Sequence, residues 1–154
     1  MSIAIETARQ PDVERLLGLG DEFAMSLYPV EECFLLDLAE LEAPGVSVFV
    51  ARSANAALGM AALVVKADGS AEMKRVFVED RARGQGLAGQ LLDAVEALAR
   101  AAGVGVIQLE TGPRSVAALA LYEKHGYRHI PLFGQYLGSA SSVCMEKSLT
   151  LDEL

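Results

Sequence analysis

The stretch from residue 46 to residue 102 limits the possible folds more than any other part of the chain. Three strand-like runs follow one another there, separated only by a short turn at 53–56 and an Asp-Gly hairpin signal. These runs are 46–52, 58–65 and 71–79, and they predict an antiparallel meander. Apolar residues then recur at helical spacing over 86–102. The pattern therefore predicts a sheet that is covered by a long amphipathic helix.

Outside this stretch, hydrophobic periodicity predicts four further strands and three further helices. The strands are expected at 2–8, 106–111, 127–133 and 141–149, and the helices at 11–27, 31–41 and 115–125. In the helix over 31–41, Leu35, Leu38 and Ala39 are expected to face inward. The element order β-α-α-β-β-β-α-β-α-β-β predicts one α/β (α+β) domain over residues 1–154, built on a mixed sheet.

Composition excludes several other classes of protein. The 154 residues are 52% hydrophobic, which suffices for one sizeable core and argues against a disordered chain. The longest clean apolar run, 61–65, is far shorter than the about 20 residues of a membrane span. The N-terminus lacks the pattern of a secretory signal, so we expect a cytoplasmic protein with no membrane partner. Cys33 and Cys144 lack metal-ligand spacing and are expected to be small buried residues, with no metal bound.

The net charge of −8 is concentrated at one end of the chain. Residues 1–42 hold ten acidic and two basic residues, whereas the remainder holds eleven of each. A protein that binds nucleic acid carries clustered Lys and Arg, so nucleic acid is not expected as a partner. The acidic segment either steers a cationic ligand towards the protein or forms the solvated face of amphipathic helices.

A glycine-rich turn, Arg83 to Gly89, joins the third strand of the meander to the long helix. Free backbone N–H groups at a helix start favour an anion, so a phosphate or pyrophosphate is the expected occupant. The glycines match the dinucleotide fingerprint G-x-G-x-x-G, but the turn follows a half-polar strand late in the chain, which contradicts that fold. No Lys-Ser or Lys-Thr follows the glycines, which excludes a P-loop. A tight turn without a ligand remains the alternative.

Two motifs follow one another along the chain. The first is Val76-Phe77-Val78 followed by Arg83-x-x-Gly86-x-Ala88. The second is Leu109-Glu110-Thr111 followed by Ser115-x-x-Ala118-x-x-Leu121-Tyr122-x-Lys124-x-Gly126-Tyr127. Together they resemble the GNAT superfamily of N-acetyltransferases, in particular its bacterial members that act on small molecules. The resemblance implies a mostly antiparallel central sheet of about seven strands with helices on both faces. It also implies acetyl-CoA as the co-substrate and, as a family expectation, a homodimer.

The resemblance further implies where acetyl-CoA binds. The pyrophosphate is expected on the amides of the glycine-rich turn, and the pantetheine arm on the backbone of Val76 and Val78. That strand and the strand at 106–111 are expected to splay apart to admit the arm. The expected contacts are Val76, Phe77, Val78, Arg83, Gly84, Gln85, Gly86, Leu87, Ala88, Gly89, Thr111, Ser115, Ala118 and Tyr122. Ser115 stands where members often have asparagine, and it is expected to cap the following helix.

Direct transfer to an amine needs a base, an acid and polarisation of the carbonyl. Tyr122 occupies the family's general-acid position, and a phenol matches a thiolate in basicity. Glu72 is the candidate base, acting through water, and the Val78 amide is expected to hold the carbonyl. The alternatives are a core aromatic for Tyr122 and a solvated residue, paired to a neighbouring Lys or Arg, for Glu72.

The acceptor pocket is expected between the two N-terminal helices and the last hairpin. Tyr28, Phe133 and Tyr136 are the candidate contacts, together with the loop at 138–142. The acceptor is expected to be an amine on a small or amino-acid-like molecule. His125 and His129 are interpreted as helix-end or solvated residues rather than bases. A protein that binds coenzyme A as a sensor or assembly subunit, without transfer, remains the second hypothesis.

Overall fold

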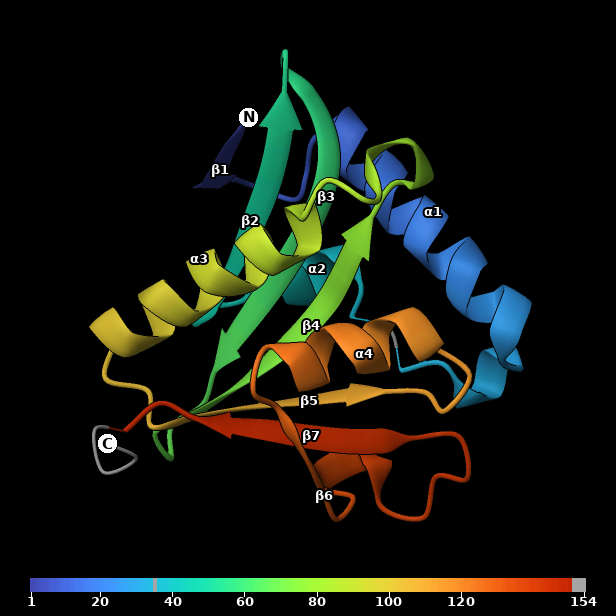
Figure 1. The fold of residues 1–154 in the computed structure, drawn as a ribbon, viewed down its shortest axis with the longest axis vertical. Helices are drawn as coiled ribbons and strands as arrows, with labels where there is room; N and C mark the ends of the chain where they lie inside the picture. The colour runs from blue at the N-terminus through green and yellow to red at the C-terminus, as the bar shows by residue number, and fades with distance from the viewer. Residues whose placement is uncertain (35, 151–154) are drawn as a thin grey trace.

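The computed structural model describes residues 1–34 and 36–150, and its core is one seven-stranded sheet in the order β1-β2-β3-β4-β5-β7-β6 (Figure 1). Among these strands β4 and β5 pair in parallel, and the other neighbours are antiparallel. The strands are β1 (Ser2–Ile5), β2 (Val46–Ser53), β3 (Ala56–Val65), β4 (Ser70–Val78), β5 (Val106–Thr111), β6 (Arg128–Ile130) and β7 (Val143–Ser148). The predicted fold class is confirmed, including the mostly antiparallel sheet of seven strands.

Helices cover both faces of the sheet, because the strand side chains alternate between two cores. In β2, Val48 and Val50 point towards α1 (Pro11–Leu27) and α2 (Leu38–Leu41), and Phe49 and Ala51 point towards α3 (Leu87–Ala101). The second core also takes Tyr122 from α4 (Val116–Lys124). Figure 1 shows α1 on one side of the sheet and α3 and α4 on the other.

The parallel pair β4 and β5 holds together over only half of β4. Its pairing runs from Ser70 opposite Val106 to Met73 opposite Leu109 and then stops. Just beyond, the β3–β4 register shifts and Arg75 adopts a φ of 58°, which marks a β-bulge. Figure 1 shows the two strands diverging from their paired ends. The expected splay is therefore present, and the backbone of the last five residues of β4 has no strand partner on the β5 side.

The predicted helix over 31–41 is wrong. A 3₁₀ turn, η1 (Val30–Glu32), is followed by extended chain, and α2 begins only after Asp37. Asp37 and Glu40 form a capping box, in which each side chain accepts a hydrogen bond from the other residue's backbone amide. Leu38 packs against the α1 core, whereas Ala39 is exposed; Leu35 lies outside the described residues.

Several smaller expectations also need correction. Strands β1, β6 and β7 are shorter than predicted, as the bounds above show. Cys144 is buried as expected, but Cys33 is partly exposed because the chain around it is not helical. Ser115 precedes α4 as predicted, but its side chain makes no capping hydrogen bond. No helix within the described residues is long and apolar enough to span a membrane.

Candidate active site

A cavity of about 600 Å³ opens between the end of β4, the glycine-rich turn and α4. Gly84 and Gly86 adopt φ of +82° and +74°, and a Cβ on either would meet open space rather than protein. The turn therefore presents its backbone directly to the cavity, beside the first amides of α3. All the predicted coenzyme A contacts line this cavity except Gln85 and Thr111, and Thr111 lines the neighbouring cavity described next.

The charged groups that line this cavity are basic. Arg83, Arg114 and Lys124 contribute cationic side chains, and His125 adds an imidazole, whereas no carboxylate is among the described lining residues. In a chain with a net charge of −8, such a lining is selective for anions. The Arg83 guanidinium donates to the Val78 carbonyl oxygen (3.2 Å) and lies over the Phe23 ring.

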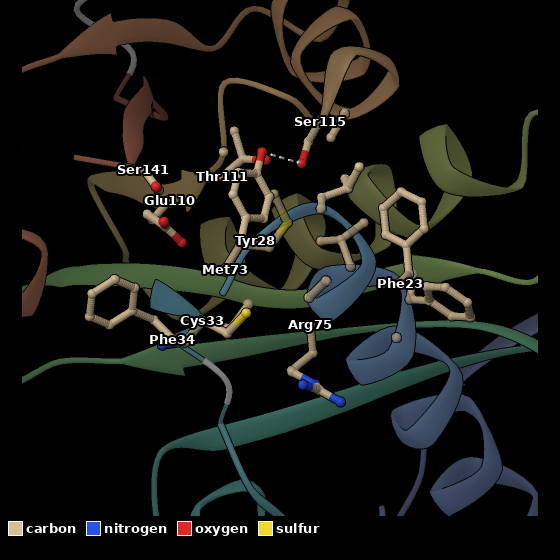
Figure 2. A pocket seen from close by; sticks show the side chains of 18 of the residues that line it. Phe23, Tyr28, Cys33, Phe34, Met73, Arg75, Glu110, Thr111, Ser115 and Ser141 are labelled. Carbon is tan, nitrogen blue, oxygen red and sulfur yellow. Dashed lines mark hydrogen bonds between the residues drawn. The ribbon is translucent and has the colours of Figure 1, made fainter. Parts of the chain in front are cut away.

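A second cavity, of about 200 Å³, lies on the α1 side of the diverging strands. Its floor comes from β4, and its walls come from α1, the segment after η1 and the end of β5. Figure 2 shows Phe34, Glu110 and Ser141 at one end of this cavity and Phe23 at the other. The two cavities share Val76, Phe77 and Tyr122, so they meet where β4 and β5 separate.

Tyr122 lies at the junction of the two cavities and is 6% exposed. Its ring packs edge-on against Tyr127, while its hydroxyl makes no hydrogen bond to another described residue. Burial, and then the charge of Glu110, raise the pKa of the Tyr122 phenol well above its ordinary value. The residue is therefore a protonated hydroxyl at neutral pH and lies where the cavities join.

Glu72 lines the second cavity but is already engaged. Its carboxylate accepts a hydrogen bond of 2.5 Å from the Tyr136 hydroxyl and lies 3.5 Å from Lys66 Nζ and 3.8 Å from Lys74 Nζ. The side chain is buried rather than solvated, and pairing with a neighbouring lysine is present. Its role as the base is not tested by this arrangement and stays a prediction.

Glu110 belongs to the second motif, but no catalytic role is predicted for it from the sequence. It lies one residue past the last β4–β5 pair, and the Ser142 hydroxyl donates to it at 2.7 Å. Burial raises the pKa of the Glu110 carboxyl from 4.5 to about 7, against the opposing effects of this hydrogen bond and of Lys74. A carboxyl that titrates near neutral pH inside a cavity is suited to accept and release protons.

The three predicted acceptor contacts are placed differently from one another. Tyr28 lines the second cavity and rests on Gly112, where its hydroxyl accepts from the Arg114 amide (2.8 Å) and lies 3.3 Å from Ser115 Oγ. Tyr136, in η3 (Gly134–Tyr136), lines the same cavity and is 1% exposed. Phe133 does not line the cavity, and its ring packs edge-on against the ring of Tyr136.

The histidines lie at the edge of this arrangement. His125 ends α4, with Nδ1 4.0 Å from the Asp93 carboxylate, which confirms the helix-end interpretation. His129 is exposed near Glu123. Within the described residues, no group of three or more His, Cys, Asp or Glu side chains is placed to hold a metal ion.

Comparison with known proteins places the chain in a family. Residues 4–127 match the model of the acetyltransferase (GNAT) family. An IAA acetyltransferase from Azospirillum brasilense is 37% identical over 150 residues, which cover 97% of this chain and 98% of that protein.

Solved structures agree with this relationship. A Klebsiella pneumoniae protein described as an acyl-CoA N-acyltransferase is 32% identical, with a TM-score of 0.83 over 97% of both chains. The PaiA N-acetyltransferase from Thermoplasma acidophilum, solved with coenzyme A, shares the fold at 18% identity, with a TM-score of 0.72 over 96% of this chain and 99% of that one. Because the family match spans most of the sequence and two relatives exceed 30% identity over nearly all of it, the chain belongs to the acetyltransferase (GNAT) family.

Proposed function

We propose that the protein is an acetyl-CoA-dependent N-acetyltransferase that transfers the acetyl group directly to the primary amine of a small molecule. The observation that carries this proposal is a cavity lined by cationic side chains and glycine-turn amides that meets a second, mixed-charge cavity at Tyr122. Coenzyme A is a polyanion with a long uncharged arm, so it fits the first cavity, and an acceptor fits the second. A cytoplasmic location, the homodimer and the lack of a metal stay predictions from the sequence.

The expected chemistry is attack of the amine nitrogen on the thioester carbonyl. A nitrogen–carbon bond forms, the carbon–sulfur bond breaks, and the nitrogen gives up a proton while the sulfur leaves as a thiolate. We propose that Glu110 accepts the proton, because its pKa of about 7 lies between that of an ordinary carboxyl and that of an amine. Glu72, the base predicted from the sequence, is then the alternative, since its carboxylate is already in contact with Tyr136, Lys66 and Lys74.

We propose that the Tyr122 hydroxyl donates a hydrogen bond to the departing sulfur. A phenol with a pKa well above its ordinary value is a weaker acid than a thiol, so complete proton transfer is uphill. A hydrogen bond to a thiolate in a site with little water is still strongly stabilising. The contribution of Tyr122 is therefore stabilisation of the leaving group, with the final proton supplied from solvent.

Acetyl-CoA is expected to raise the melting temperature of the protein, whereas NAD is not. A ligand that binds the folded state at about 100 times its Kd stabilises it by about 2.7 kcal/mol, which corresponds to several degrees in a chain of this size. Thermal unfolding with each ligand at 1 mM provides the measurement. A shift with NAD alone would contradict the proposal, and a shift with acetyl-CoA without thiol release on any amine would support the sensor hypothesis.

Tyr122→Phe is expected to lower kcat by about 10- to 100-fold, because it removes the hydrogen bond to the thiolate and keeps the ring. The Kd for acetyl-CoA should change by less than about twofold, since Val76, Phe77 and the glycine-rich turn still line the cavity. Thiol release and calorimetric titration separate the two effects. An unchanged kcat would mean that Tyr122 is a core aromatic residue and takes no part in the chemistry.

A further inference from the structure

The size of the second cavity limits what the acceptor can be. At about 200 Å³ it is little larger than the about 150 Å³ cavity that holds a benzene ring in another protein. One ring with a short arm fills this space, whereas a molecule of several linked rings would extend beyond it into solvent. Typical pockets for larger ligands begin at about 300 Å³.

The walls of this cavity are apolar and aromatic on several sides. Phe34 and Tyr136 meet edge-on with ring centroids 4.9 Å apart, and Met60 and Phe77 add apolar surface. Figure 2 shows the Phe34 ring at the same end of the cavity as Glu110. An aromatic ring placed against these walls would bury its faces and edges next to other rings, which is a favourable arrangement.

The cationic side chains of the cavity are already committed. Arg75 donates to Asp21 (2.6 Å) and to the Leu17 carbonyl oxygen (2.9 Å), and its side chain is 7% exposed. Lys74 donates to the Tyr136 hydroxyl (3.1 Å) and lies beside Glu72, with its side chain 10% exposed. A carboxylate on the acceptor would therefore have to share each cation with the polar partner that the cation already has.

Two carboxylates of the cavity, in contrast, can accept further hydrogen bonds. Glu110 and Glu32 each accept a hydrogen bond from one serine, Ser142 and Ser141 respectively, through one carboxylate oxygen. Both residues line the cavity, and the second oxygen of each makes no hydrogen bond to another described residue. The local field therefore favours a cationic amine and opposes an anionic group.

From size, walls and charge, we infer that the acceptor is a compact arylalkylamine-like molecule: a primary amine on a short arm attached to one apolar ring, without an acidic group. This inference rests on the proposed N-acetyltransferase function and names the substrate class of that same site. The amine lies towards Glu110, and the ring packs against the wall formed by Phe34 and Tyr136.

Thiol release from acetyl-CoA tests the inference with three probe amines: 2-phenylethylamine, phenylalanine and kanamycin. The first two differ only by a carboxylate, and the third carries several linked rings. We expect kcat/KM for 2-phenylethylamine to exceed that for phenylalanine by at least about 30-fold and that for kanamycin by more, with N-acetylphenylethylamine identified by mass spectrometry.

The outcomes separate the inference from the proposed function. If phenylalanine or kanamycin is acetylated as well as 2-phenylethylamine, or better, the substrate class is wrong while N-acetyl transfer stands. If acetyl-CoA binds and none of the three amines is acetylated, the inference fails, and the proposed transfer fails with it only if a wider panel of primary amines also releases no thiol.

Glu32→Gln supplies a second test that does not depend on ranking substrates. It removes one negative charge from the cavity, so KM for 2-phenylethylamine should rise about 3- to 10-fold while kcat changes by less than twofold. The matched control is Glu31→Gln, in the same 3₁₀ turn, where the side chain is exposed and does not line the cavity. Equal shifts in both variants would mean that overall charge, not the cavity, attracts the amine, and would overturn the inference.

Discussion

Replacing Glu110 by glutamine is expected to lower kcat/KM by about 100- to 1,000-fold, the usual contribution of a positioned general base. The substitution keeps the shape of the side chain and an oxygen that can accept from Ser142, so it removes little besides the titrating proton site. In the wild type, activity should rise with pH through about 7, because the base must be deprotonated to accept a proton. In the variant that rise should disappear. Thiol release between pH 5.5 and 9 provides the profile.

Glu72→Gln is the matched control, because both carboxylates lie on the same face of the sheet and line the same cavity. If Glu110 is the base, the Glu72 variant loses activity only through displaced neighbours, Lys74 and Tyr136, and keeps the rise near pH 7. If Glu72 is the base, its variant loses the acidic limb of the profile and the Glu110 variant keeps it. The acidic limb of the pH profile thus distinguishes the two assignments even if both variants are slow.

Glu110→Gln is expected to lower activity but to increase the stability of the protein above neutral pH. A carboxyl whose pKa is raised from 4.5 to about 7 on folding stabilises the protein fully below pH 4.5, and that contribution is lost as the pH rises through about 7. Glutamine does not ionise, so Glu110→Gln should increase the free energy of unfolding at pH 8, by on the order of 1–3 kcal/mol, and change it little near pH 4.5. Urea denaturation at the two pH values measures the difference. Equal stability changes at both would show that the pKa of Glu110 is not raised.

The sequence could group the residues of the larger cavity, where coenzyme A is proposed to bind, because the determinants of that grouping are local. The glycines of the turn, the long helix after it and Tyr122 on α4 each depend on spacing within one or two adjacent elements. The wrong helix prediction over 31–41 also has a local cause. The prediction followed the apolar residues at helical spacing and overlooked the capping box of Asp37 and Glu40, which starts the helix at Leu38.

Glu110 could not be assigned in the same way. Its pKa is raised by burial among segments remote in sequence, and its hydrogen-bond partner Ser142 lies 32 residues away. From sequence it is one polar residue in an alternating strand, and such residues are mostly solvent-exposed. The left-handed backbone at Arg75, which accompanies the splay of β4, likewise has no sequence signal, because nothing in a Lys-Arg-Val run demands a positive φ.

Gly112→Ala is expected to be among the most damaging small substitutions in the chain. A Cβ at this position would overlap the ring and hydroxyl of Tyr28, which rests directly on the glycine. Gly112 does not have a left-handed φ, so the backbone accepts alanine and the conflict lies entirely with Tyr28. Tyr28 would have to leave, and its hydrogen bond from the Arg114 amide and contact with Ser115 would be lost. We expect destabilisation by about 2–4 kcal/mol, from lost aromatic packing and hydrogen bonding.

The destabilisation caused by Gly112→Ala should arise only from its overlap with Tyr28. In a Tyr28→Ala background the space above Gly112 is empty, so adding Gly112→Ala should cost nothing or gain about 0.5 kcal/mol by restricting the unfolded chain. Gly18→Ala is the control: its Cβ meets no atom within 4 Å on an exposed turn of α1, and it should stabilise the protein by about 0.5–1 kcal/mol. Urea denaturation of the four proteins in the double-mutant cycle gives the coupling energy. Additive costs for Gly112→Ala and Tyr28→Ala would mean that Tyr28 does not hold the end of α1 against the start of α4, and the wall of the acceptor cavity would need another explanation.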